Sequence, residues 1–80
     1  LMQQLQNLQE HLNKMTVECI ALNKTVADAI KLKSEPSILP AIDMMLETTL
    51  IKKMSIQLRA VIEELVQASD IFEELYGTDE

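Results

Sequence analysis

The stretch Ser34-Glu35-Pro36-Ser37-Ile38-Leu39-Pro40 decides the fold of this chain. It holds both prolines of the sequence, and the only glycine, Gly77, lies far beyond it. Proline disfavours helical backbone at the residue before it, yet it fits the first turn of a new helix. The segments on either side contain neither Pro nor Gly. The sequence therefore predicts a helix over about 1–33, a turn at 34–40 and a helix over about 41–76.

Each predicted helix carries a line of apolar side chains spaced alternately three and four residues apart. The first line comprises Leu1, Leu5, Leu8, Leu12, Met15, Cys19, Leu22, Val26 and Ala29. The second line comprises Ile51, Met54, Leu58, Val61, Leu65, Ala68, Phe72 and Leu75. A 3.5-residue period lets helices wrap around each other along a buried seam. We therefore expect an all-α fold, a helical hairpin or coiled coil of two long helices joined by a short Pro-containing turn.

The start of the second helix has its own apolar face, out of phase with the later line. This face comprises Ile42, Met45, Leu46 and Leu50, with Thr49 among them and Met44 beside it. The change of register indicates a bend near residues 47–50, a second contact surface, or a helix buried on all sides. Methionine adapts to varied partners, so the Met44-Met45 pair is the strongest candidate for docking a partner, with gap-filling in a core as the alternative.

The charge balance narrows the classes of partner. The chain carries 13 acids against 7 bases, a net charge of −6, and no base follows Arg59. This acidity argues against nucleic acid and against an anionic membrane surface. No apolar run approaches the roughly 18–20 residues of a membrane span, so we expect no membrane insertion. The late acids are expected on a solvated outer face, with Glu64 at the flank of the seam, or alternatively against a basic partner: Glu63, Glu64, Asp70, Glu73, Glu74, Asp79 and Glu80.

No residue pattern carries chemistry. His11 is the only histidine, on the flank of the seam, and Cys19 is the only cysteine, expected to pack as a small apolar side chain within it. There is no nucleophile–base pair and no glycine-rich phosphate loop, so we expect no enzyme activity, no catalytic residues, no cofactor and no metal. A single cysteine favours a reducing, intracellular compartment, cytoplasmic or nuclear. Because the sequence begins at Leu1 rather than Met, we expect a piece of a longer chain.

The apolar residues outside both lines are too many for one two-stranded coiled coil to cover, and monomers seldom expose large apolar patches. We therefore expect residues 1–80 to form a single helical oligomerisation module that completes a helical bundle within a larger intracellular assembly. The partner is a protein: either further copies, as a dimer or tetramer, or different helical subunits. Parallel or antiparallel pairing and a closed or swapped hairpin both stay open. A small adaptor or chaperone that docks a client helix on the Ile42–Leu50 face is the alternative. The candidate interface residues are Leu5, Leu8, Leu12, Met15, Cys19, Leu22, Val26, Ile42, Met44, Met45, Leu46, Leu50, Ile51, Met54, Leu58, Val61, Leu65 and Phe72.

Overall fold

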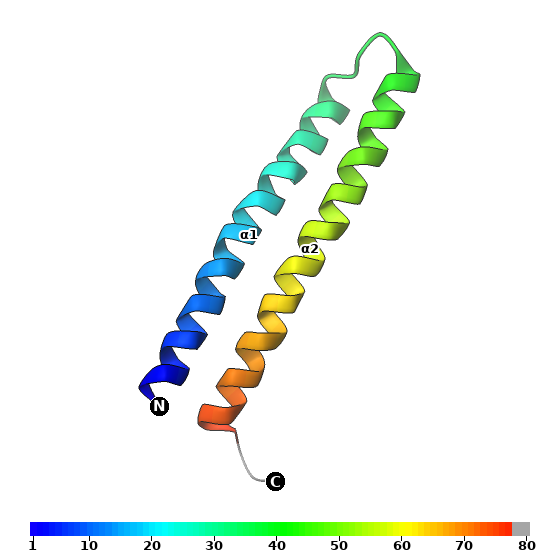
Figure 1. Ribbon diagram of the computed structural model, residues 1–80. Helices are drawn as coiled ribbons and strands as arrows, with labels where there is room; N and C mark the ends of the chain where they lie inside the picture. The colour runs from blue at the N-terminus through cyan, green and yellow to red at the C-terminus, as the bar shows by residue number, and fades with distance from the viewer. Residues whose placement is uncertain (78–80) are drawn as a thin grey trace.

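Two antiparallel helices joined by a short turn make up the fold (Figure 1). The computed structural model describes residues 1–77. Helix α1 spans Met2–Ser34 and helix α2 spans Pro40–Tyr76. The Cα atoms fill a slab of 59 × 23 × 15 Å, so the hairpin is a single layer two helices wide. The predicted fold class, two long helices joined by a short Pro-containing turn, is confirmed.

The turn is held by hydrogen bonds that prepare the start of α2. Leu39 precedes the helix and Pro40 is its first residue, where a missing N–H leaves no helical bond unmade. The Ser37 N–H donates to Asp43 Oδ2 at 2.9 Å, and the Leu39 N–H donates to Ser37 Oγ at 3.2 Å. Asp43 also places a negative charge in the first turn, where the helix dipole stabilises it. The turn is therefore specified by its own side chains.

Helix α2 runs without a break through residues 47–50, where the apolar register changes. The β-branched pair at this point is accommodated by hydrogen bonds within the helix. The Thr48 hydroxyl donates to the Met44 carbonyl at 2.9 Å, and the Thr49 hydroxyl donates to the Met45 carbonyl at 3.0 Å. Such bonds let a hydroxyl residue stay inside a helix with its polar group satisfied.

The contact between the helices follows a heptad, which we letter so that Leu8 and Met54 are a positions. Its a and d residues over 4–32 and 43–75, here called the closed seam, are all buried or half-buried. On α1 they are Gln4, Leu8, His11, Met15, Glu18, Leu22, Thr25, Ala29 and Leu32. On α2 they are Asp43, Glu47, Leu50, Met54, Gln57, Val61, Glu64, Ala68, Ile71 and Leu75. Among the described residues only Thr25 and Ala68 reach full burial, at 2% and 5% exposure. The hairpin alone therefore has almost no core.

Candidate functional site: an apolar face beside a polar seam

The closed seam is unusually polar for a helix–helix contact. Eight of its nineteen residues are polar or charged, nearly all of them at d positions. At one layer His11 Nδ1 lies 2.7 Å from Glu64 Oε2, and both side chains are largely shielded from solvent. Nearer the turn, Lys33 Nζ lies 3.1 Å from Glu47 Oε2. The His11–Glu64 pair lies within the closed seam, whereas Lys33 is exposed and reaches Glu47 from outside it.

Some polar atoms of the closed seam have no partner. Glu18 Oε1, Gln57 Oε1 and Asp43 Oδ1 are buried without a hydrogen bond. A buried polar group without a partner costs about 1–3 kcal/mol. These polar residues therefore contribute more to the alignment of the two helices than to the stability of their contact.

Away from the turn, four e positions on each helix are apolar and exposed, while the e positions nearest the turn are Lys33 and Met44. We call these eight residues the apolar face: Leu5, Leu12, Cys19 and Val26 on α1, with Ile51, Leu58, Leu65 and Phe72 on α2. In an antiparallel pair the e positions of the two helices flank the same side of the seam. The large α2 members are about half exposed, from 48% for Leu58 to 55% for Ile51. One side of the hairpin thus presents two parallel apolar stripes.

The g positions occupy the other side of the hairpin and are mostly polar or small. They are Asn7, Lys14, Ala21 and Asp28 on α1, and Leu46, Lys53, Ala60, Gln67 and Glu74 on α2. A shallow hollow of about 330 Å³ confirms that the g positions share a side, because Asp28 and Leu46 both line it. The hairpin is therefore two-sided, with its apolar side chains gathered mainly on one side.

The candidate interface residues divide into three groups. Leu8, Met15, Leu22, Leu50, Met54 and Val61 lie half-buried in the closed seam. The apolar face holds Leu5, Leu12, Cys19, Val26, Ile51, Leu58, Leu65 and Phe72. The turn-proximal residues Ile42, Met44, Met45 and Leu46 are exposed by 46%, 70%, 69% and 48%, so this end of α2 is not buried on all sides.

Three side chains lie elsewhere than the sequence predicted. Cys19, expected to pack within a seam, is exposed in the single hairpin. His11 and Glu64, expected at the flank, face each other inside the closed seam. All three differences have one cause: each apolar line occupies a and e positions, whereas the helices meet along a and d. The sequence does contain a signal for the closed seam: a second line of residues, mostly polar, occupies the d positions beside each apolar line.

The late acids lie largely on the outside. Glu63, Asp70, Glu73 and Glu74 are exposed, as expected of a solvated face. Asp79 and Glu80 lie outside the described residues.

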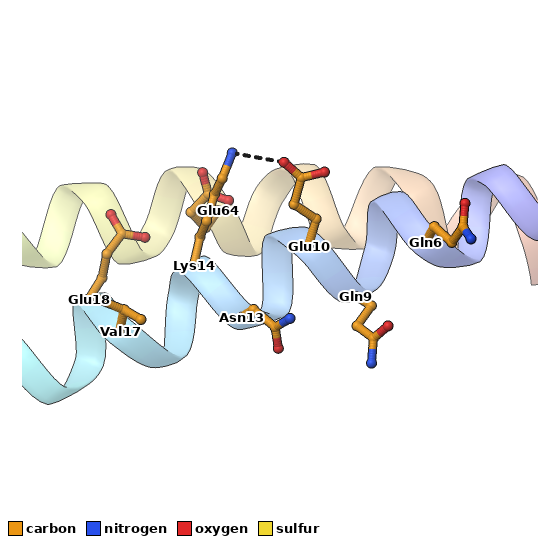
Figure 2. Close-up of a pocket in the computed structure, with 8 residues that line it drawn as sticks. All are labelled: Gln6, Gln9, Glu10, Asn13, Lys14, Val17, Glu18 and Glu64. Carbon is orange, nitrogen blue, oxygen red and sulfur yellow. Dashed lines mark ion pairs between the residues drawn. The ribbon is translucent and has the colours of Figure 1, made fainter.

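One open hollow is lined mainly by polar and charged residues. It measures about 640 Å³ and is lined by Gln6, Gln9, Glu10, Asn13, Lys14, Val17 and Glu18 of α1, with Glu64 of α2. Figure 2 shows Glu10 and Lys14 paired, at 3.5 Å, while Gln9 and Asn13 point away from them. Ligand pockets bring a few polar groups together over an apolar lining, and these side chains diverge instead. Among the described residues no three His, Cys, Asp or Glu side chains cluster to hold a metal ion.

Neither helix, over the part of the chain that the structure describes, is long and apolar enough to cross a membrane. Comparison of the chain with protein-family models, with curated proteins and with solved structures finds no match.

Proposed function

We propose that this chain is a non-enzymatic protein–protein interaction module that uses its heptad positions to pack against further helices within a larger assembly. The observation that carries the proposal is the apolar face. Its eight side chains lie on one side of an extended hairpin and are exposed there. Burying a side chain such as Leu or Ile is worth about 1.5–3 kcal/mol, so covering this face contributes as much as a small domain's whole stability.

The surface area of the hairpin supports the same proposal. The chain exposes 6478 Å². A compact protein of its mass, 9.1 kDa, would expose only about 4,900 Å². The excess, roughly 1,600 Å² by that scaling, is ample for a protein interface, which buries about 800 Å² on each partner.

A charge placed on the apolar face tests the proposal. We expect Leu58→Asp to weaken assembly at least about tenfold, since a lost 1.4 kcal/mol is a factor of ten and a buried Leu is worth more. The two helices themselves should persist, because Leu58 is not in the closed seam. The measurement is the sedimentation of tagged chain in extracts of cells that make the protein, with circular dichroism on the purified variant.

Ile56→Asp is the matched control. Like Leu58, Ile56 is a branched apolar residue on the surface of α2, and its side chain is 69% exposed. It lies two residues before Leu58, at a c position on the other side of the hairpin. We expect this variant to sediment as the natural chain does. Equal behaviour of the two variants would contradict the proposal.

A helical adaptor is the second candidate, favoured by the turn-proximal end of α2. Met44 and Met45 are among the most exposed large apolar residues, and they line a hollow of about 460 Å³ with Ala41, Thr48 and Thr49. In this case Met44→Glu combined with Met45→Glu abolishes capture of a client helix and leaves self-association intact. Loss of self-association in that double variant would count against the adaptor.

A further inference from the structure

We infer that the apolar face is covered by a second copy of this chain, packed face to face with its turn at the opposite end, so that Cys19 and Leu58 lie at the twofold axis. The inference rests on the proposed function and adds the identity and the orientation of the partner. Three observations lead to it: the direction of the apolar lines, the common midpoint of the e positions, and the distribution of charge.

The direction of the apolar lines matches a four-helix bundle. At 3.6 residues per turn, the centre of an a/e line is rotated about 50° from the centre of an a/d line. A helix in a square four-helix bundle touches neighbours on two sides, so its apolar stripe points between them, about 45° from either contact. A two-stranded coiled coil requires no offset, and a three-helix bundle requires about 30° by the same geometry. Both helices of this hairpin have an offset of about 50°, close to the value for a four-helix bundle. On both helices the apolar stripe is rotated toward the same side, the side of the apolar face.

The e positions of the two helices have their midpoints at nearly the same height. They run from Leu5 to Lys33 on α1 and from Met44 to Phe72 on α2, so Cys19 and Leu58 are the central ones. From the His11–Glu64 pair, Cys19 lies eight residues along α1 and Leu58 lies six residues back along α2. At 1.5 Å per residue their heights agree within about 3 Å. One axis can therefore relate both residues to their counterparts in a second copy.

The distribution of charge favours opposite ends for the two turns. The half of the hairpin away from the turn, residues 1–17 and 59–77, carries six acids and two bases. The half near the turn, residues 18–58, carries five of each. Turns at the same end would place the two acidic halves together, where like charges repel. Opposed turns place each acidic half beside a neutral, lysine-containing half.

Disulfide trapping tests this arrangement, because Cys19 is the only cysteine. A disulfide requires Cα atoms about 4.4–6.8 Å apart, which antiparallel helices reach where they cross a twofold axis. We expect mild oxidant to convert most of the purified chain to a covalent dimer. Light scattering before oxidation should already give twice the 9.1 kDa chain mass. Cys19→Ser should abolish the covalent species and keep the mass.

Moving the cysteine separates the orientations. On the Cys19→Ser background, Leu58→Cys should also trap a dimer, because Leu58 lies at the same axis. Ile56→Cys is the matched control on the opposite side and should not. If the natural chain instead forms a disulfide only with the Leu58→Cys chain, the hairpins run with their turns together and the orientation inferred here is overturned.

A purified chain that stays at 9.1 kDa while remaining helical would overturn the second copy as partner. The proposed function would survive that result if Leu58→Asp, unlike Ile56→Asp, still removed the chain from its assembly in cell extracts. The two failures are therefore distinguishable.

Discussion

At the scale of single residues, the closed seam shows how specificity can be set at a cost in stability. Glu18 and Gln57 are both half-buried d residues of the closed seam, and one oxygen of each is buried without a partner. The His11–Glu64 pair, one heptad away, is satisfied by contrast. Polar groups inside a helical seam penalise any register that buries them differently. These d residues thus hold the hairpin in one alignment and leave the apolar residues for the other side.

Replacing the two residues with unpartnered oxygens, Glu18 and Gln57, should stabilise the hairpin. We expect Glu18→Leu combined with Gln57→Leu to raise the free energy of unfolding by about 1–3 kcal/mol, because two buried polar atoms without partners are removed. Urea unfolding at a fixed protein concentration measures the change. Asn13→Leu, an exposed site on α1, is the control and should change stability little. A double variant no more stable than this control would show that the unpartnered oxygens of Glu18 and Gln57 do not destabilise the hairpin.

At the scale of the elements, the turn is the part that the sequence predicted best. Each proline restricts the residue before it, and no other Pro or Gly interrupts the helices until Gly77, so both helix ends at the turn lie within about one residue of the prediction, well inside the usual scatter of such boundaries. The hydrogen bond from Ser37 to Asp43 was not predictable from spacing alone, because it depends on how the chain reverses.

Removing that bond should weaken the reversal. We expect Asp43→Ala to lower the free energy of unfolding by up to about 1 kcal/mol, since the Ser37 N–H loses its acceptor and the first turn of α2 loses a favourable charge. Removal of the unpartnered Asp43 Oδ1 offsets part of this loss. Thermal unfolding followed by circular dichroism is the measurement. Asp28→Ala removes an exposed acid in mid-helix and serves as the control. No difference between the two variants would mean that solvent replaces the Asp43 contact fully.

The contact between the elements was harder to predict than the elements themselves. Leu8, Met15, Met54 and Val61 belong to the apolar lines and are half-buried in the closed seam, where they are a positions. The lines did not reveal that Glu64 faces α1, because they run along a and e positions whereas the helices meet along a and d. Periodicity alone reports the average direction of burial. The split between a closed seam and an apolar face therefore required the structure.

At the scale of the whole molecule, the shape of the hairpin favours association with other helices, whereas its net charge opposes association between copies. A hairpin of 59 × 23 × 15 Å leaves its apolar face uncovered, which favours association. A net charge of −6 on each chain makes copies repel one another. The hydrophobic term is not screened by salt, whereas the repulsion is, because the Debye length falls to about 10 Å at 0.1 M ionic strength. The balance between the two terms is therefore adjustable in solution.

Salt should accordingly strengthen self-association. We expect the dissociation constant to fall severalfold between about 0.02 M and 0.5 M NaCl, since screening of surface charge is nearly complete at the higher value. Sedimentation equilibrium across a salt series measures it. The Leu58→Asp chain should stay dissociated throughout. Weaker association at high salt would instead indicate an interface held by opposite charges.

Thr25 and Ala68 are the only residues between 1 and 77 that a lone hairpin hides from solvent. A structure with so little hidden opens often, and an opened backbone is a substrate for proteases. Covering one face would slow that opening by mass action. Turnover of this chain would then follow the supply of its partner: orphan copies are degraded, assembled copies persist, and stoichiometry is maintained without a separate degradation signal.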